Sequence, residues 1–501
     1  MKNAIGREGL DNPFEGAFAK ARVIPFQPVK TDIARHPVFG LSLDDVLDRL
    51  QIRDGMTLSF HHHLRNGDFV LDRVMRRIQA RGVKNLTIAA SSIFPCHQCL
   101  VELFEDGTVT RVISAYVQGP VAKAISQGRC RETCVFTTHG GRPRAILEGD
   151  LKIDMAFIAA PGVDRDGNLT GSDGPSACGV LGYAVADAQM ADRVVAITDY
   201  VADQVNRPEI AHHLVDYVVQ MDGIGDPTGI VSGSTVITRD PVGLKIARDC
   251  ATLIAHSGLL KEGFSFQTGA GGISLAVAEE VRKRMLQVGI RGSFACGGAT
   301  DYLVRMLADG LFERLYDVQC FNLDAVDSVR IHENHIKIDA HTYANIDNPD
   351  NIVNKLDVVV LGATEIDLDF NVNVTTGTDG VILGGSGGHA DTAAGAKLAI
   401  IVSKLVNARL SCLVERVTTV TTPGETIDVL VTDRGIAINP RRQDLIDRLR
   451  KETRLEIFTV NELLQMAEAL TGKPRPLVTG ERIVAISEYR DGTILDVIRQ
   501  V

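Results

Sequence analysis

Residues 361–388 read LGATEIDLDFNVNVTTGTDGVILGGSGG. The apolar run at residues 358–361 that leads into this stretch is typical of a buried parallel strand, and one carboxylate, Glu365, follows it. The stretch ends in a glycine cluster made of Gly384, Gly385, Gly387 and Gly388. Such a pair suits acyl transfer, because a carboxylate can attack a carbonyl while free backbone N–H groups hold the oxyanion. The same sequence is also consistent with a strand, a solvated glutamate and a glycine turn that have no catalytic role.

Composition places the chain among large globular proteins. Its 501 residues are too many for one ordinary core, so we expect two domains of roughly 200–250 residues or three smaller ones. A formal net charge of -10 argues against nucleic-acid binding. We expect no export signal and no membrane span, because charges interrupt every long apolar segment. Nine cysteines, an odd number, then fit free thiols, and we expect a soluble cytoplasmic protein.

Hydrophobic strands alternate with amphipathic helices, which predicts an α/β fold built on open parallel sheets. One predicted helix runs from Asp68 to Gly82 and another from Ser274 to Gly289, each between two strands. These matching contexts predict two similar halves. A stretch rich in proline and glycine near residues 222–233 is the best boundary, so we predict domains at residues 1–225 and 226–501. The charged tail from Arg441 onward is expected to cap the second half.

A second glycine-rich turn, QTGAGGIS at residues 267–274, lies between a predicted strand and a predicted helix. Backbone N–H groups and the helix N-terminus make such a turn suitable for an oxyanion, a carboxylate or a phosphate. The order G-A-G-G does not match the dinucleotide fingerprint, which disfavours an NAD enzyme. A tight turn that needs glycine only for packing explains it as well. The candidate ligand-binding residues of this turn are Gly269, Ala270, Gly271 and Gly272.

Three consecutive histidines, His61, His62 and His63, occupy the corresponding loop of the first half. Alternate side chains at a strand end face opposite ways, so the three cannot all reach one metal ion, and the usual zinc spacing is missing. We expect them to bind a polycarboxylate together with Arg65 and Asn66. A polar loop with one histidine packed and the others solvated is the alternative.

Two other patterns suggest metal sites only weakly. Cys96-x-x-Cys99 and Cys130-x-x-x-Cys134 lie far apart and differ in spacing, so buried thiols are the better interpretation. Residues 164–168 partly match a calcium loop but lack its closing glutamate, so we expect a turn held by Asp and Asn side chains. The sequence therefore predicts no metal.

The segment around Glu365, in which E-I-D-L precedes G-G-S-G-G-H-A-D, resembles the acetyl-CoA hydrolase and CoA-transferase superfamily. QTGAGGISLAV resembles the oxyanion loop of that superfamily, and residues 426–442, TIDVLVTDRGIAINPRR, resemble its VTE-x-G-V-A strand. The resemblance implies two halves of CoA-transferase type. It further implies that Glu365 accepts the acyl group and that the later glycine turn, with His389, holds the CoA end of a thioester.

More narrowly, the whole chain resembles the family of citrate lyase alpha subunits, through SFHHHLRNGD, IGDPTGIVSGSTVITRDP, GFSFQTGAGGISLAV and EYRDGTILDV. This resemblance implies a citrate CoA-transferase that exchanges acetyl for citryl on a thioester and releases acetate. The implied co-substrate is a CoA thioester or the phosphoribosyl-dephospho-CoA arm of a carrier, with nothing bound covalently to this chain. The implied partners are a beta subunit, which cleaves the citryl thioester, and an acyl carrier gamma subunit, and we expect a homo-oligomer.

Two chemical routes remain open at this point. Glu365 attacks first and forms an acyl-glutamyl anhydride, or citrate attacks directly while Glu365 only positions groups. We expect Glu365 to be essential in either route. Two functions of other classes stay as alternatives. One is a sugar-phosphate isomerase-like or ligand-sensing domain of the same architecture, and the other is a non-catalytic scaffold of a lyase complex.

Overall fold

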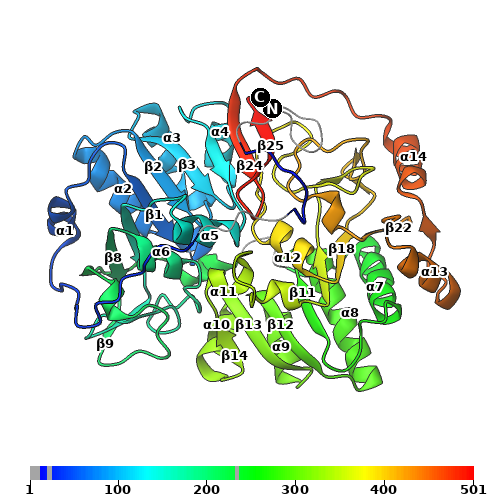
Figure 1. Cartoon of the computed structure of the whole chain (residues 1–501), viewed down its shortest axis with the longest axis horizontal. Helices are drawn as coiled ribbons and strands as arrows, with labels where there is room; N and C mark the ends of the chain where they lie inside the picture. The colour runs from blue at the N-terminus through cyan, green and yellow to red at the C-terminus, as the bar shows by residue number, and fades with distance from the viewer. Residues whose placement is uncertain (1–11, 20–24, 62, 232–235) are drawn as a thin grey trace.

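The computed structural model describes residues 12–19, 25–61, 63–231 and 236–501. Two nine-stranded sheets form two halves, the first among the blue to teal elements of Figure 1 and the second among the green to orange ones. Neighbouring strands are parallel except for one antiparallel pair in each sheet. Each half also buries its own apolar core. The predicted α/β architecture with parallel sheets is confirmed.

The first sheet has the strand order β10-β8-β5-β1-β2-β3-β4-β24-β25. Its strands are β1 (Thr57–His61), β2 (Leu86–Ala90), β3 (Val109–Ser114), β4 (Cys134–Phe136), β5 (Met155–Ala159), β8 (Arg193–Thr198), β10 (Tyr217–Gln220), β24 (Ile483–Glu488) and β25 (Ile494–Arg499). The helices of this half are α1 (Leu43–Leu50), α2 (Val70–Ala80), α3 (Cys99–Glu105), α4 (Gly119–Ser126), α5 (Gly141–Glu148) and α6 (Ala184–Met190). A small sheet joins β6 (Gly162–Asp164), β7 (Leu169–Thr170) and β9 (Val201–Ala202).

The second sheet has the strand order β14-β13-β12-β11-β15-β18-β21-β22-β23. Its strands are β11 (Ser265–Thr268), β12 (Gly292–Ala299), β13 (Phe312–Cys320), β14 (His335–Lys337), β15 (Val358–Leu361), β18 (Leu398–Val402), β21 (Val429–Thr432), β22 (Gly435–Ile438) and β23 (Ile457–Phe458). Two short ribbons pair β16 (Glu365–Ile366) with β17 (Val372–Asn373) and β19 (Val406–Asn407) with β20 (Leu410–Ser411).

Eight helices belong to this second half of the described chain. They are α7 (Pro241–His256), α8 (Gly272–Val288), α9 (Asp301–Ala308), α10 (Leu323–Ile331), α11 (Ala340–Ala344), α12 (His389–Gly395), α13 (Gln443–Glu452) and α14 (Val460–Thr471). Among all the helices that the structure describes, none is both long and apolar enough to cross a membrane.

Local sequence signals account for the central elements of the second half. The strand predicted at residues 358–361 is β15, whose side chains are all buried between β11 and β18. Asp240 caps α7 by accepting a hydrogen bond from the Gly243 N–H at 3.1 Å, and Pro241 takes the first helical position. Gly289 ends α8 in a left-handed conformation, with φ of 68°.

The C-terminal tail does not simply cap the second half, as the sequence predicted. β24 pairs in parallel with β4, and β25 closes the edge of the first sheet, drawn in red beside α4 in Figure 1. β4 has only three residues and would otherwise present its unpaired edge to solvent, which β24 covers. The first sheet therefore contains strands that precede the second half in the sequence and strands that follow it. The division at residue 225 stays a prediction for the remainder of the chain.

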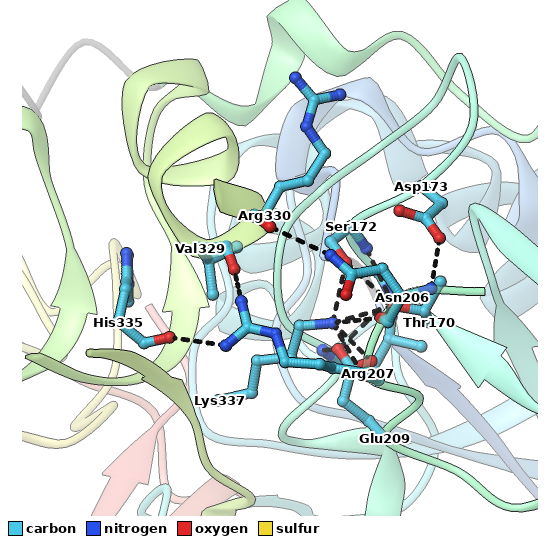
Figure 2. Close-up of polar contacts among 12 residues, drawn as sticks. Thr170, Ser172, Asp173, Asn206, Arg207, Glu209, Val329, Arg330, His335 and Lys337 are labelled. Carbon is cyan, nitrogen blue, oxygen red and sulfur yellow. Dashed lines mark hydrogen bonds and ion pairs between the residues drawn. The ribbon is translucent and has the colours of Figure 1, made fainter. Parts of the chain in front are cut away.

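A buried lysine joins the two halves on the side of β14. Figure 2 shows Lys337 reaching from the second half into a ring of oxygen atoms of the first. Its ammonium donates to Thr170 Oγ1 at 2.9 Å, Ser172 Oγ at 2.8 Å and Glu209 Oε2 at 3.0 Å. The Glu209 carboxylate also accepts from the Leu181 N–H at 3.1 Å. Both charged side chains are only 7% exposed, and burial raises the pKa of Glu209.

Lys337→Met should leave the Glu209 carboxylate buried without its cation. We expect the free energy of unfolding to fall by about 3–5 kcal/mol, measured from urea unfolding midpoints. Lys473→Met is the matched control, because Lys473 pairs with Glu415 at 2.7 Å while the two side chains are 69% and 64% exposed. That exposed pair should contribute about 1 kcal/mol or less. Equal losses in the two variants would contradict a special role for the buried pair.

Candidate active site

A cavity of about 590 Å³, which we call the main cavity, lies between the two halves. The first half lines it with residues that follow the ends of β1 to β4, namely Arg65, Ser92, Tyr116 and His139. The second half lines it with residues at the ends of β11, β12, β13 and β15, namely Thr268, Gly298, Gln319 and Leu361. The carboxyl ends of parallel strands in both sheets thus meet at one place, where α/β proteins bind their ligands.

Both predicted glycine turns reach the main cavity. Gly269, Ala270 and Gly271 line it from one turn, and Gly385, Gly387, Gly388 and His389 line it from the other. Gly272 faces a neighbouring cavity instead, and Gly384 does not line the main cavity. Among the residues that the structure describes, none accepts a hydrogen bond from the N–H of Ala270, Gly271, Gly385 or Gly388. Two turns therefore offer free backbone donors to one space.

The turn at residues 384–388 also binds the second half to the first. The Gly387 N–H donates to the Ala115 carbonyl at 3.0 Å, and the Gly387 carbonyl accepts from the His139 N–H at 2.8 Å. A Cβ atom at Gly385 would lie 2.3 Å from the Ala115 carbonyl oxygen, closer than any side chain allows. Glycine is required here because two backbones touch.

Arg65 is the predicted substrate-binding residue that lines the main cavity. Its guanidinium lies 5.3 Å from the ring centre of Phe94 and 4.7 Å from that of Phe321, and it donates to the Ile230 carbonyl at 3.2 Å. Burial lowers the pKa of this guanidinium. No carboxylate of the described chain forms an ion pair with it. A buried guanidinium without a carboxylate partner favours binding of an anion.

His61, His63 and Asn66 do not line the main cavity. His61 is buried behind it and pairs with Asp187 at 3.0 Å, and Asp187 also accepts two hydrogen bonds from Arg142 at 2.7 Å. His63 is buried as well. Asn66 is exposed and accepts from the Cys96 N–H at 3.1 Å. The prediction of direct substrate contacts by these residues is not supported by their positions, and His62 lies outside the described residues.

Glu365 faces away from the main cavity. Its carboxylate accepts from the Thr418 N–H at 2.8 Å, the Thr418 hydroxyl at 3.0 Å and the Asn373 amide at 2.9 Å. It borders a separate cavity of about 670 Å³, whereas its neighbour Thr364 lines the main cavity. Successive side chains in an extended segment point to opposite sides, and this places the two residues in different cavities. A catalytic role of Glu365 stays a prediction, and its carboxylate borders the 670 Å³ cavity and not the main cavity.

Among the described residues, none that lines the main cavity is acidic. Its polar side chains are an arginine, hydroxyl groups, amides and two histidines. The chain therefore places cations and neutral hydrogen-bond donors around this space, and an anion is the ligand that such a lining favours.

His389 lines the main cavity, but both of its ring nitrogens are engaged by the protein. Nε2 lies 2.9 Å from the Gly362 carbonyl oxygen, and Nδ1 lies 2.7 Å from Thr422 Oγ1. A carbonyl can only accept, so Nε2 carries the proton and Nδ1 accepts from the Thr422 hydroxyl. Burial lowers the pKa of His389 to about 4. The ring is neutral and anchors the glycine turn.

Sequence patterns missed four polar residues of the main cavity. The His139 ring lies 4.4 Å from that of Tyr183, and the Gln267 amide donates to the Tyr343 hydroxyl at 2.8 Å. Burial, with Arg142 nearby, lowers the pKa of His139 to about 3, so this ring is neutral too. These residues stand alone at strand ends and helix starts. The position of Gln267 at the end of the strand before the first glycine turn was the one available signal, and the other three residues had none.

The two sequence patterns that weakly suggested metal sites are a set of free thiols and a turn held by an aspartate. The nine cysteines are all described and all free, and burial together with Asp68 raises the pKa of Cys96 to about 12. Asp164 Oδ1 accepts from three successive backbone N–H groups at residues 166–168, which confirms the predicted turn. Within the described ranges, no three His, Cys, Asp or Glu side chains are arranged to hold a metal ion.

Comparisons with known proteins assign the chain to a family. The family model described as "Citrate lyase, alpha subunit (CitF)" matches residues 38–501. A citrate lyase alpha chain of Haemophilus influenzae is 45% identical over 461 residues, which cover 92% of either chain. One of Klebsiella pneumoniae is 45% identical over 490 residues, 98% of this chain and 96% of that one.

Solved structures with a similar fold include a member of the same family. The alpha subunit of citrate lyase from Streptococcus mutans, solved in complex with citrate, is 42% identical with a TM-score of 0.92. The match covers 97% of this chain and 95% of that one. The alpha subunit of a malonate decarboxylase from Acinetobacter baumannii shares the fold at 15% identity, with a TM-score of 0.61. That match covers 89% of this chain and 97% of that one.

His389→Gln should make the protein less sensitive to acid. The pKa of His389 lies below its ordinary value, so its contribution to stability is full above pH 6.5 and is lost as the pH falls toward 4. Glutamine can donate to Gly362 and accept from Thr422 without titrating. We expect its urea unfolding midpoint to fall less between pH 7 and pH 4.5 than that of the parent. His332→Gln, at an exposed position, should not flatten this pH dependence; if both variants behave alike, the assignment is wrong.

Proposed function

The chain belongs to the family of citrate lyase alpha subunits, and from that membership we propose that it carries out the acyl exchange of a citrate lyase. Acetyl-thioester and citrate are converted into citryl-thioester and acetate. The observation that carries this proposal is the lining of the main cavity. It combines a buried arginine that has no acidic partner in the described chain with free N–H groups from two glycine turns.

The buried Arg65 is proposed to bind a carboxylate of citrate. Citrate supplies the negative charge that this guanidinium otherwise lacks, and a planar guanidinium can form two parallel hydrogen bonds with a carboxylate. The guanidinium lies over the rings of Phe94 and Phe321, whose faces attract a cation. The neutral His139, Gln267 and Tyr343 are left to bind the uncharged parts of the substrates.

Of the two chemical routes, the lining of the main cavity favours direct attack by citrate. An acyl-glutamyl intermediate needs an enzyme carboxylate at the thioester, and the part of the chain that the structure describes places none in the lining of this cavity. In the direct route a citrate carboxylate attacks the thioester carbonyl, the thiolate leaves, and a mixed anhydride of acetate and citrate forms. The thiolate then attacks the citryl carbonyl, and acetate leaves. The N–H groups of Ala270, Gly271, Gly385 and Gly388 are proposed to stabilise the oxyanions of both steps.

The alternative functions fit this cavity less well. A sugar-phosphate isomerase requires a base that abstracts a proton, usually a carboxylate, and the two histidines of the cavity are a weak base and a fully bonded ring. A scaffold without activity has no need of a desolvated arginine beside free N–H donors.

The co-substrate and the partners form the finer part of the proposal. We propose that the thioester is held by CoA or by the phosphoribosyl-dephospho-CoA arm of an acyl carrier gamma subunit. A beta subunit is proposed to cleave the citryl thioester, and assembly as a homo-oligomer is proposed with it. The similarity to citrate lyase alpha chains over nearly the whole length supports these partners.

The central test is acetate release from acetyl-CoA by the purified chain. We expect acetate and citryl-CoA to form in equal amounts when citrate is present, and neither to form without it. Isomerisation of ribose 5-phosphate, assayed in parallel, should be absent. Acetate release that does not depend on citrate, or no exchange with either CoA or carrier thioesters, would overturn the proposal.

Arg65→Met should raise the KM for citrate about ten- to a hundredfold, because a charge-assisted hydrogen bond to a buried group contributes roughly 1.5–3 kcal/mol. Arg65→Lys should recover part of this loss. Arg73→Met is the matched control, since Arg73 stacks on Phe69 at 5.4 Å outside the main cavity. Initial rates over a range of citrate concentrations measure the effect. A KM unchanged by Arg65→Met would exclude Arg65 as the citrate ligand.

Glu365→Gln distinguishes the two routes. An amide cannot form the acyl anhydride, so the covalent route predicts a loss of several orders of magnitude in kcat. Because Glu365 borders a different cavity, the expectation that it is essential in either route is revised for the direct route, which now predicts a kcat within about fivefold of the parent. The unfolding free energy should fall by about 1–3 kcal/mol, because an amide N–H₂ group then faces the donors of Thr418 and Asn373. Hydroxylamine added during turnover should leave Glu365 unmodified, as read by peptide mass spectrometry.

A further inference from the structure

One carboxylate of the second half holds both neighbours of His139 in the first half. Asp391, in the first turn of α12, accepts a hydrogen bond from the Thr138 hydroxyl at 2.9 Å and another from the Gly140 N–H at 2.9 Å. Between them, the His139 N–H donates to the Gly387 carbonyl at 2.8 Å. Three successive residues of the first half are therefore attached to the start of α12 and the turn that precedes it.

A buried arginine accompanies this carboxylate. The side chain of Asp391 is fully buried, and Arg490, which is 4% exposed, lies with its Nε 3.7 Å from Asp391 Oδ1. Arg490 belongs to the turn between β24 and β25, and among the described residues Asp391 is the one carboxylate that pairs with it. Removing either member would leave the other charge buried and uncompensated. The pair therefore keeps the Asp391 carboxylate beside the loop that it bonds.

The side chain of His139 lies on the other side of this loop, at the main cavity. His139 lines that cavity, whereas its two neighbours and Asp391 do not. Its ring centre lies 4.4 Å from that of Tyr183, and a Cβ atom at Gly388 would lie 3.7 Å from His139 Cδ2. The ring thus lies beside the glycine turn, and the bonds to its neighbouring residues decide where it is.

The His139 ring has hydrogen-bonding capacity that the protein does not use. Within the described ranges, no residue forms a hydrogen bond with either of its ring nitrogens. The ring is neutral, so it has one N–H donor and one acceptor nitrogen. A hydroxyl group can likewise both donate and accept, whereas a carboxylate only accepts. The hydroxyl is the one uncharged polar group of citrate at neutral pH, so it matches this ring better than the carboxylates do.

We propose that Asp391 is a positioning residue for citrate selection, which holds the His139 ring where the ring can bond the hydroxyl group of citrate. This role rests on the proposed acyl exchange, and it extends the binding of an anion by Arg65 to a choice among tricarboxylates. Tricarballylate carries the three carboxylates of citrate but lacks the hydroxyl. Arg65 should bind both compounds equally well, and His139 should favour citrate.

Asp391→Asn should weaken this preference. With its one oxygen an amide can accept from the Thr138 hydroxyl or from the Gly140 N–H, and its N–H₂ group then faces the other. In the parent we expect the Kd of citrate to be about five- to tenfold lower than that of tricarballylate, the effect of one neutral hydrogen bond. In the variant the ratio should fall to about two or less. Calorimetry without a thioester measures both constants, and a simple loss of folded protein would not change their ratio.

Asp357→Asn is the matched control. Asp357 also accepts from one backbone N–H and one hydroxyl, both of Ser265, at 2.9 and 3.2 Å, and it pairs with Lys397 at 2.8 Å. It lies at the start of β15, at the opposite end of this strand from the main cavity, so the preference should remain as in the parent.

Thr138→Val is a milder second variant, because it removes one of the two bonds to the loop and retains the buried pair of Asp391 and Arg490. Its ratio of dissociation constants should lie between those of the parent and Asp391→Asn. A full preference for citrate in both Thr138→Val and Asp391→Asn would overturn the positioning role.

His139→Leu tests whether Asp391 acts through the ring. Leucine has no hydrogen-bonding group, so the preference for citrate should be lost, and adding Asp391→Asn should not change the ratio further. A preference that survives in His139→Leu, or a further change in the double variant, would overturn the proposal. So would a parent that binds citrate and tricarballylate equally, even if it exchanges acyl groups. A parent that prefers citrate but exchanges no acyl group would instead refute the proposed function.

Discussion

The position of the main cavity depends on a close backbone contact between the two halves. The turn at residues 384–388 lies against the strand ends of the first sheet so closely that Gly385 has no room for a side chain. Through this contact the carboxyl ends of two separate sheets face each other across one space. Arg65 from the first half and the turn at residues 269–271 from the second then line the same cavity. Neither half contains this combination by itself.

Electrostatics explains how a chain with a net charge of -10 can bind a substrate that is itself strongly negative. The acidic side chains that the structure describes lie elsewhere, many of them in ion pairs with arginine and lysine. Arg65, the one cation among the described residues of the cavity, lies over two aromatic rings instead of beside a carboxylate. Glycine also makes this arrangement possible, since a Cβ at Gly298 would lie 2.3 Å from the Phe321 ring. The lining therefore favours an anion both because Arg65 is present and because no acidic side chain of the described residues lies beside it.

Short sequence patterns correctly predicted the elements whose structure depends on interactions between residues close together in the chain. The apolar run of β15, the cap of α7 and the glycine end of α8 all follow from residues within a few positions of each other. The two glycine turns were found for the same reason. The placement of Glu365 was not, because one step along an extended segment changes the cavity that a side chain faces. His139 and Tyr343 were missed because tertiary packing alone brings them together.

The position of β24 has a consequence for how the protein is made. The Thr133 hydroxyl bonds the Ile483 carbonyl across 350 residues of chain, and β4 is held by pairing with β24. The first sheet therefore stays incomplete on the ribosome until the whole second half has been synthesised. His139 and Ala115, which follow β4 and β3, form part of the wall against which the glycine turn packs. The wall of the substrate cavity that β4 supports is accordingly completed only after the last strands of the chain have been made.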